Sequence, residues 1–207
     1  MSLVNIGVLI SGGGTNLQSL IDNIKEGHIN GNIKVVISNK KDAYGLVRAE
    51  HEGIESLYIN RKKYSSNEEY NRKILEEFKK REVELVVLAG YLKVLSKEFV
   101  EEYKGRIINI HPSLIPSFCG KGYYGEKVHQ SVLEYGVKIT GATVHFVDEG
   151  TDTGQIIIQE AVEVKDDDTV DTLKNRVLEV EHRILPKAVK LYCDRRIKID
   201  GRKVVIK

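Results

Sequence analysis

Two kinds of apolar segment alternate along the first half of the chain. Short runs rich in Val, Ile and Leu predict strands at residues 4–10, 33–38, 57–59, 85–89 and 107–110. The run at 85–89 shows no alternation, which predicts a strand buried on both faces. Between these runs apolar residues recur at helical spacing, which predicts helices at residues 17–24, 43–52, 67–80 and 96–103, the last of them capped by Ser96. This alternation predicts an α/β fold: a doubly wound, mainly parallel sheet with right-handed crossovers and a Rossmann-like N-terminal half.

The second half has longer strands, so we expect the sheet to continue there as a mixed sheet. Strands are predicted at residues 140–147 and 155–164, joined by the acidic turn 148–154. His145 and Phe146 alternate along the first of them, so one of the two is expected to point inward. Around these strands the sequence predicts a Gly/Tyr-rich loop at 117–125, a helix at 126–135, a long helix from a cap at Asp168 to about Tyr192, and a hairpin formed by 197–199 and 204–206.

The bulk composition is that of a single folded domain over residues 1–207, with 41% hydrophobic and 30% charged residues. The 32 basic residues nearly balance the 30 acidic ones, so bulk charge gives no argument for a nucleic-acid or membrane partner. A phosphorylated small substrate, by contrast, needs only a few local donors. No apolar run approaches the ~20 residues of a membrane span and no signal peptide is recognisable, which predicts a cytoplasmic protein.

The two cysteines, Cys119 and Cys193, predict free thiols in a reducing compartment, because neither lies in a spacing that binds metal. The acidic run at residues 166–168 is better explained by helix capping and by the helix dipole than by a metal site. The sequence therefore predicts no metal ion.

Three conspicuous segments directly follow predicted strands, at residues 11–16, 90–95 and 109–116. In open α/β sheets, ligands bind beyond the carboxyl ends of the strands. The first segment, Ser-Gly-Gly-Gly-Thr-Asn, exposes backbone N–H groups at the start of a helix, which suits a phosphate. It matches neither the GxGxxG nor the Walker A spacing, so a generic phosphate-binding turn and a tight turn without a ligand are both open.

Asn109 and His111 lie two residues apart on a predicted strand, so they share a face, and Pro112 then ends the strand. Asp152 follows in the turn 148–154, where an ordinary turn aspartate is the alternative interpretation. A carboxamide can donate to a developing oxyanion, an imidazole can move a proton, and a carboxylate can favour the charged imidazole. These are the groups that formyl or acyl transfer without a covalent intermediate needs.

Four segments of the chain resemble the folate-dependent formyltransferases, and within them the glycinamide ribonucleotide formyltransferase family. They are VLISGGGTNLQ at 8–18, VVLAGY at 86–91, NIHPSLIP at 109–116, and GATVHFV at 141–147, which leads to Asp152. The similarity extends from Val4 to about Leu191. It implies that the formyl group of 10-formyltetrahydrofolate, the co-substrate, is transferred to the amine of glycinamide ribonucleotide in de novo purine biosynthesis, which gives formylglycinamide ribonucleotide and tetrahydrofolate.

The resemblance also implies roles for individual residues. The catalytic residues would be Asn109 and His111, which stabilise an oxyanion, and Asp152, which assists proton transfer. The ribonucleotide would contact Gly14, Thr15, Asn16 and Glu181. The folate would contact Asn67, Leu92, Lys93, Val94, Leu95, Asp148, Thr151 and Asp152. Residues 1–110 would then bind the ribonucleotide phosphate, residues 111–192 would hold the catalytic and folate site, and residues 193–207 would form a C-terminal hairpin.

Four features depart from the family pattern. Lys93 stands where an arginine is frequent, Thr143 where a serine is common, and Gln155 where a proline is frequent. Residues 119–125 lengthen the loop around the expected substrate mouth. None of these is one of the three expected catalytic residues, so they bear on the folate pocket more than on the reaction.

Three alternatives share part of this pattern. Methionyl-tRNA formyltransferases carry a further tRNA-binding domain, which the length and charge balance of this chain do not favour. Formyltetrahydrofolate hydrolases carry an N-terminal regulatory domain, whereas the pattern here begins at about residue 3, so we expect water as acceptor only in a side reaction. A non-catalytic Rossmann-type nucleotide-binding module would suit the glycine loop, but Ser-Asn-Lys at 38–40 stands where a ribose-binding acid is expected. The expected partners are small-molecule substrates, without nucleic acid or membrane, in a monomer or homodimer.

Overall fold

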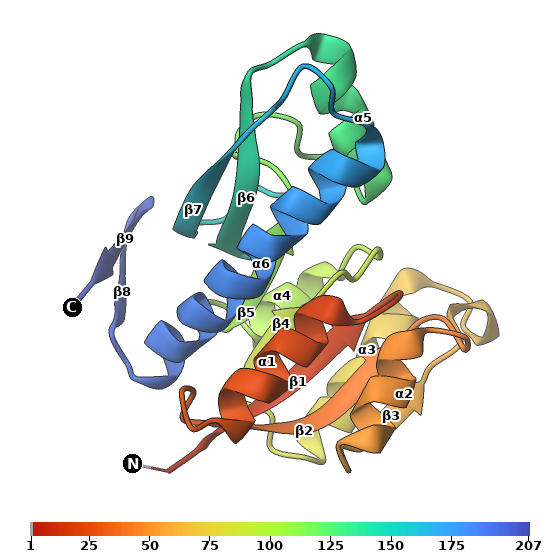
Figure 1. Ribbon diagram of the computed structural model, residues 1–207. Coiled ribbons are helices and arrows are strands. Elements are labelled where there is room, and N and C mark those ends of the chain that lie inside the picture. The colour runs from red at the N-terminus through yellow and green to blue at the C-terminus, as the bar shows by residue number, and fades with distance from the viewer. Residues whose placement is uncertain (1) are drawn as a thin grey trace.

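A seven-stranded sheet runs through the computed structural model, which describes residues 2–207 (Figure 1). Its strand order is β3-β2-β1-β4-β5-β6-β7, and β8 and β9 form a separate hairpin. Strands β1 to β5 pair in parallel, whereas β6 pairs antiparallel with β5 and β7. The strands are β1 (Val4–Ile10), β2 (Gly31–Ser38), β3 (Ser56–Tyr58), β4 (Leu85–Leu88), β5 (Ile107–His111), β6 (Ile139–Phe146), β7 (Ile156–Glu163), β8 (Ile197–Asp200) and β9 (Lys203–Ile206). The predicted α/β fold, a doubly wound and mainly parallel sheet that becomes mixed, is confirmed.

Helices cover both faces of the sheet, as a doubly wound fold requires. Side chains of α1, α2 and α6 belong to the core on one face, and those of α3 and α4 to the core on the other. The helices are α1 (Thr15–Lys25), α2 (Tyr44–His51), α3 (Asn67–Lys79), α4 (Lys97–Glu102), α5 (Glu126–Tyr135) and α6 (Val170–Cys193), with a short 3-10 helix η1 (Arg61–Lys63) that the sequence pattern does not predict. In the part of the chain that the structure describes, no helix is long and apolar enough to cross a membrane.

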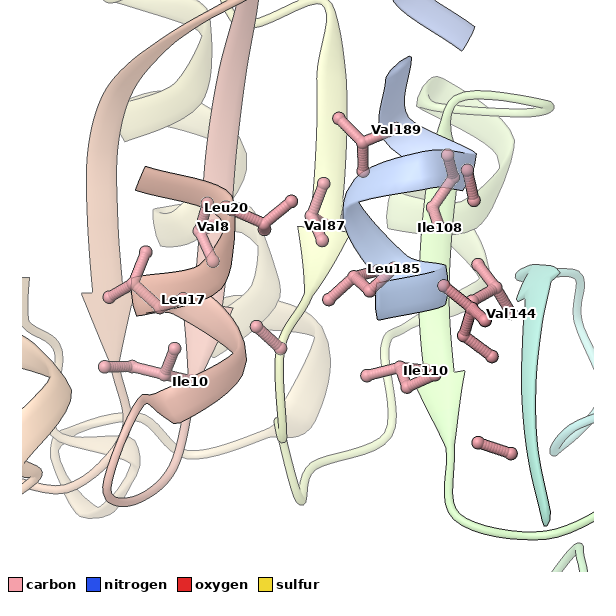
Figure 2. Close-up of a cluster of buried hydrophobic side chains, with 14 of the residues drawn as sticks. Val8, Ile10, Leu17, Leu20, Val87, Ile108, Ile110, Val144, Leu185 and Val189 are labelled. Atoms are coloured by element: carbon pink, nitrogen blue, oxygen red, sulfur yellow. The ribbon is translucent and has the colours of Figure 1, made fainter. Parts of the chain in front are cut away.

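The apolar side chains of β1 divide between two cores, one on each face of the sheet. Val8 and Ile10 point to the face covered by α1 and α6, where they belong to one cluster with Leu17 and Leu185 (Figure 2). Leu9 points the opposite way, into the core under α3 and α4. All five side chains are fully buried. Alternation along residues 8–10 therefore serves two cores at once, and all three positions are apolar.

The start of α6 corrects one prediction. Asp168 is not the cap: the N-cap is Thr169, whose hydroxyl accepts from the backbone N–H of Thr172 at 3.2 Å. The Thr172 hydroxyl accepts in return from the Thr169 N–H at 2.9 Å, which completes a capping box. Asp168 is instead engaged by the Arg176 guanidinium and by the Lys165 N–H, and the hydrogen bonds from Arg176 lower its pKa most. Because the Asp168 carboxylate is occupied by these partners, the next residue, Thr169, caps the helix.

Two other local predictions are confirmed. The Ser96 hydroxyl caps α4 and accepts from the Phe99 N–H at 3.3 Å. The C-terminal hairpin forms, with Ile197 opposite Ile206 in its antiparallel register. Both features depend only on residues close together in the chain.

Candidate active site

The loops that follow β1 and β4 meet at the carboxyl end of the sheet. The Ser11 N–H donates to the carbonyl of Gly90 at 3.1 Å, and the Leu92 N–H donates to the Ser11 hydroxyl at 2.9 Å. That hydroxyl donates to Oδ1 of Asn39 at 2.6 Å, which ties in the end of β2. Two of the three segments expected at this edge therefore lie against each other, and the third follows β5, the neighbour of β4.

Asn109 and His111 lie on β5, which pairs antiparallel with β6. His145 stands directly opposite Asn109, and Thr143 stands opposite His111. Nδ2 of Asn109 lies 3.1 Å from Nε2 of His145. Asn109 is half-buried, whereas His111 is only 5% exposed. The end of β5 thus presents a partly accessible carboxamide and a nearly buried imidazole on one face.

Asp152 reaches both histidines from the turn between β6 and β7. Its Oδ2 lies 3.6 Å from Nδ1 of His111, and its Oδ1 lies 3.7 Å from Nε2 of His145. Its φ of 58° lies in the left-handed region, which strains a residue that carries a Cβ. The Gly120 N–H donates to Oδ2 at 2.8 Å. The structure therefore brings together the three side chains that the sequence singled out, and backbone geometry fixes the carboxylate between the two imidazoles.

His145 is a site residue that the sequence pattern does not single out. Its Nδ1 lies 2.7 Å from the Phe146 carbonyl, which can only accept, so Nδ1 carries the proton and Nε2 accepts from Asn109. Burial lowers the pKa of His145, which favours this neutral form. The prediction that one of His145 and Phe146 points inward is incomplete, because both are buried: Phe146 packs in the core with α6 while His145 faces the site. Only the register of β5 against β6 could have identified it.

The glycine loop ends where α1 begins, and Gly14 is the N-cap residue of that helix. Its φ is +72°, and a Cβ there would lie 2.5 Å from Cα of Gly45, so only glycine fits. No side chain in residues 2–207 caps α1. The first N–H groups of the helix therefore have no side-chain partner and suit an anion.

Asn16 of α1 and Glu181 of α6 form a buried pair beside this loop, with Thr15 as the first residue of α1. Nδ2 of Asn16 donates to Oε2 of Glu181 at 2.6 Å. Burial raises the pKa of Glu181 to about 7, although the hydrogen bond from Asn16 acts in the opposite direction. Within the described residues, Oδ1 of Asn16 has no hydrogen-bond partner. A buried carboxyl and an unpaired amide oxygen can both accept from the hydroxyls of a sugar.

Comparison with known protein families identifies relatives of this chain. The family model described as formyl transferase matches residues 4–189. The chain belongs to the formyl transferase family. It is 41% identical to the phosphoribosylglycinamide formyltransferase of Haemophilus influenzae over 194 residues, which cover 94% of this chain and 89% of that protein. It is 49% identical over 191 residues to the trifunctional purine biosynthetic protein adenosine-3 of Gallus gallus; these cover 91% of this chain but only 18% of that protein.

Solved structures agree with the family match. A glycinamide ribonucleotide transformylase from Symbiobacterium toebii superimposes with a TM-score of 0.94 at 44% identity, over 99% of this chain and 94% of that chain. A formyltetrahydrofolate deformylase from Pseudomonas syringae has a TM-score of 0.89 at 26% identity, over 99% of this chain and 66% of that chain. The family resemblance predicted from the four sequence segments is confirmed.

In this formyl transferase, the residues after β4 that we expect to contact the folate differ in exposure. Leu92, Lys93 and Val94 lie on the exposed surface of the loop. Nδ2 of Asn67, the first residue of α3, donates to the Val94 carbonyl at 3.2 Å. Leu95, by contrast, is buried in the core under α3 and α4. Leu95 therefore fixes the loop, and the three residues before it form its outer surface.

The turn between β6 and β7 holds the remaining residues expected at the folate. Oδ1 of Asp148 accepts from the Gly150 N–H at 3.1 Å and from the Thr153 hydroxyl. Thr151 is exposed next to Asp152. The Asp148 carboxylate thus shapes the turn that carries Asp152.

No group of three or more His, Cys, Asp or Glu side chains in residues 2–207 is arranged to hold a metal ion. Cys119 and Cys193 are free thiols. Burial raises the pKa of both, and the nearby Asp152 carboxylate adds to the effect at Cys119. The protonated thiol is therefore favoured at both cysteines.

Proposed function

We propose that this chain transfers the formyl group of 10-formyltetrahydrofolate to the amine of glycinamide ribonucleotide, giving formylglycinamide ribonucleotide and tetrahydrofolate. One observation carries the proposal: an uncapped helix N-terminus and the buried Asn16–Glu181 pair lie at the same sheet edge as Asn109, His111 and Asp152. The first set suits a phosphate and a sugar, and the second suits acyl-group chemistry. The names of the relatives from Haemophilus influenzae and Symbiobacterium toebii support the same acceptor.

In the proposed reaction the amine attacks the formyl carbon directly, and the formyl oxygen becomes an oxyanion. Asn109 has two Nδ2 protons; His145 accepts one, which leaves the other for the oxyanion. His111 would be the second donor through Nδ1, because its 3.6 Å separation from Asp152 is longer than a good hydrogen bond. One oxyanion donor is typically worth about 10²–10³ in rate. These two donors supply the charge stabilisation, so the proposal includes no metal.

Asp152 would assist proton transfer between the two substrates through an ordered water. The attacking amine loses one proton and the leaving folate nitrogen gains one, so the step is balanced without an outside acid or base. The left-handed backbone of Asp152 and the hydrogen bond from Gly120 support this role, because they hold the carboxylate in one position.

Each substrate has a set of expected contacts. Gly14, Thr15 and Asn16 would bind the ribonucleotide phosphate, and Glu181 would accept from its ribose hydroxyls. The folate would lie against the exposed loop after β4 and the turn between β6 and β7, next to Asn67. Holding the two reactants in register can supply roughly 7–11 kcal/mol of the barrier reduction.

Hydrolysis of the formyl folate is the second candidate, because a formyltetrahydrofolate deformylase is a structural neighbour. Water as acceptor would leave the Asn16–Glu181 pair and the glycine loop without a role. We therefore expect hydrolysis only as a slow side reaction.

A spectrophotometric assay with a 10-formyl folate donor, with and without glycinamide ribonucleotide, separates these functions. We expect folate product only when the ribonucleotide is present. Equal rates with and without it would indicate hydrolysis. Absence of product in both cases would favour a nucleotide-binding module without catalysis.

The division into a phosphate-binding half and a catalytic half, the monomer or homodimer, the lack of nucleic-acid or membrane partners and the cytoplasmic location stay predictions. A relative from Arabidopsis thaliana is named chloroplastic, so location varies among relatives.

A further inference from the structure

One short turn after β5 contacts both members of the His111–Asp152 pair through its backbone. The Phe118 carbonyl lies 3.0 Å from Nε2 of His111, and the Gly120 N–H donates to Oδ2 of Asp152 at 2.8 Å. A carbonyl can only accept, so Nε2 must carry a proton. The turn thus gives the imidazole an acceptor and the carboxylate a donor.

This contact restricts where the protons of His111 lie. With Nε2 protonated, a neutral imidazole would turn the lone pair of Nδ1 toward the Asp152 carboxylate 3.6 Å away, which is repulsive. Nε2 of His145 also lies near this carboxylate, but it accepts from Asn109, whereas Nδ1 of His111 has no donor within residues 2–207. A second proton, on Nδ1, removes that repulsion. The Phe118 carbonyl therefore reserves Nδ1 for a proton that faces Asp152.

Ser113 holds this turn from the inside. Its hydroxyl donates to the Ser117 carbonyl at 2.7 Å and lies 3.3 Å from the Phe118 carbonyl. The single hydroxyl proton goes mainly to the closer carbonyl, so the Phe118 carbonyl stays available to His111. Because Ser113 is fully buried, bulk water does not replace its hydroxyl when it is removed.

The neighbouring strands hold this segment from outside. The Thr143 hydroxyl of β6 donates to the Ser113 carbonyl at 2.6 Å and accepts from the Ile115 N–H at 3.1 Å. Nε2 of Gln159, on β7, donates to the same hydroxyl at 3.0 Å and to the Ile115 carbonyl at 2.9 Å. A chain of hydrogen bonds therefore runs from the exposed edge of β7 to the turn beside His111.

We propose that Ser113 is a positioning residue for formyl transfer: it keeps the Phe118 carbonyl on Nε2 of His111 and so reserves Nδ1 for the proton that His111 would donate to the oxyanion. The inference rests on the proposed catalytic roles of His111 and Asp152. Ser113 acts through the backbone of the turn and touches no reacting atom. Without its hydroxyl the turn loosens, and His111 gains access to its other neutral tautomer.

The test compares Ser113→Ala with Ser117→Ala in the full chain. Ser117 is exposed, and its hydroxyl has no hydrogen bond to any other part of residues 2–207, so the same chemical change is made on the same segment. The readouts are kcat and KM for both substrates, and the 15N NMR spectrum of histidine-labelled protein, in which His111→Asn identifies the His111 signals. We expect Ser113→Ala to lower kcat roughly tenfold, with KM within about twofold. Its His111 spectrum should show a partly unprotonated Nε2, whereas the wild type and Ser117→Ala should keep Nε2 protonated.

Either of two results overturns the proposal: wild-type kcat in Ser113→Ala, or a lower kcat with an unchanged His111 spectrum, since structural damage alone would explain the latter. If Ser113→Ala does not fold, Gln159→Ala removes two hydrogen bonds of the same chain from an exposed position. Gln159→Ala should lower kcat about two- to threefold with the same change in the His111 spectrum. An unchanged His111 spectrum in this variant would also overturn the proposal. Full activity in His111→Asn would overturn the proposed function of His111 itself, whereas an inactive His111→Asn with an unaffected Ser113→Ala overturns only the role of Ser113.

Discussion

The glycine loop at residues 11–16 and the cluster of Asn109, His111, His145 and Asp152 lie at the same edge of the sheet but are built in different ways. The loop is one continuous stretch whose geometry follows from its own glycines and from the start of α1. The cluster is assembled from β5, β6 and the turn after β6, which contribute Asn109, His111, His145 and Asp152. The first region depends on local backbone conformation, and the second on the register of an antiparallel strand pair. We expect changes in the loop to affect substrate binding and changes in the cluster to affect the chemical step.

The largest effect should come from Asn109→Ala, in the cluster. Removing one oxyanion donor should lower kcat by about 10²–10³, with the KM for the ribonucleotide within about twofold. Steady-state kinetics with both substrates varied measures this, and Asn32→Ala, at an exposed position of β2, is the matched control. A change in KM alone would mean that the two regions do not divide binding and chemistry as argued.

Glu181→Gln tests the buried pair beside the loop through stability against pH. The pKa of Glu181 is raised to about 7, above its ordinary 4.5, so its contribution to stability is complete below about pH 4.5 and is lost as the pH rises to 7. Glutamine does not titrate, so the unfolding free energy of the variant relative to wild type should increase by about 3 kcal/mol across this range. Urea unfolding at several pH values measures the difference. A difference that is constant from pH 4 to 8 would refute the buried, protonated carboxyl.

Gly14→Ala should disturb the loop itself. A Cβ at φ +72° would lie 2.5 Å from the Gly45 backbone, so the variant should lose about 1–3 kcal/mol of stability and show a raised KM for the ribonucleotide. Its kcat should stay close to wild type. The matched control is Gly13→Ala, where an added Cβ meets no atom within 4 Å. Equal effects of both variants would argue against the close approach at Gly14.

The smallest effect should come from Thr169→Ala, outside both regions. Loss of the capping hydroxyl should lower the unfolding free energy by about 1 kcal/mol and leave kcat and KM unchanged. Thermal or urea unfolding gives the number. An unchanged unfolding free energy would mean that Thr169 does not stabilise the start of α6.

The fold and the glycine loop could be predicted because both depend on patterns within short stretches of the sequence. The apolar runs identified all the strands of the parallel half; β1, β2, β4 and β5 are mostly buried, whereas β3 at the edge is partly exposed. The position of the loop after β1 followed from the rule for open sheets, and Ser96 from its place before a helical pattern. The prediction that Asp168 caps α6 was wrong because its carboxylate pairs with Arg176, which lies further along that helix.

The cluster was open to prediction only in part. The sequence pointed to Asn109, His111 and Asp152 by chemistry and by resemblance, and the structure brings them within reach of one another. It could not point to His145, because the pairing of β5 with β6 is a register that the apolar pattern does not fix. Nor could the sequence show that backbone groups of Phe118 and Gly120 contact His111 and Asp152. Every residue type has a backbone carbonyl and nearly every one an N–H, so such contacts cannot be predicted from residue identity.

The account rests most directly on the claim that the His111–Asp152 pair serves the chemical step and not substrate binding. Steady-state kinetics of Asp152→Asn tests it, and asparagine is a suitable replacement because it tolerates the left-handed backbone at this position. We predict a kcat lowered by about 10² or more, with the KM for the ribonucleotide within about twofold and a melting temperature near that of the wild type. Wild-type kcat in a normally folded Asp152→Asn protein would contradict the account.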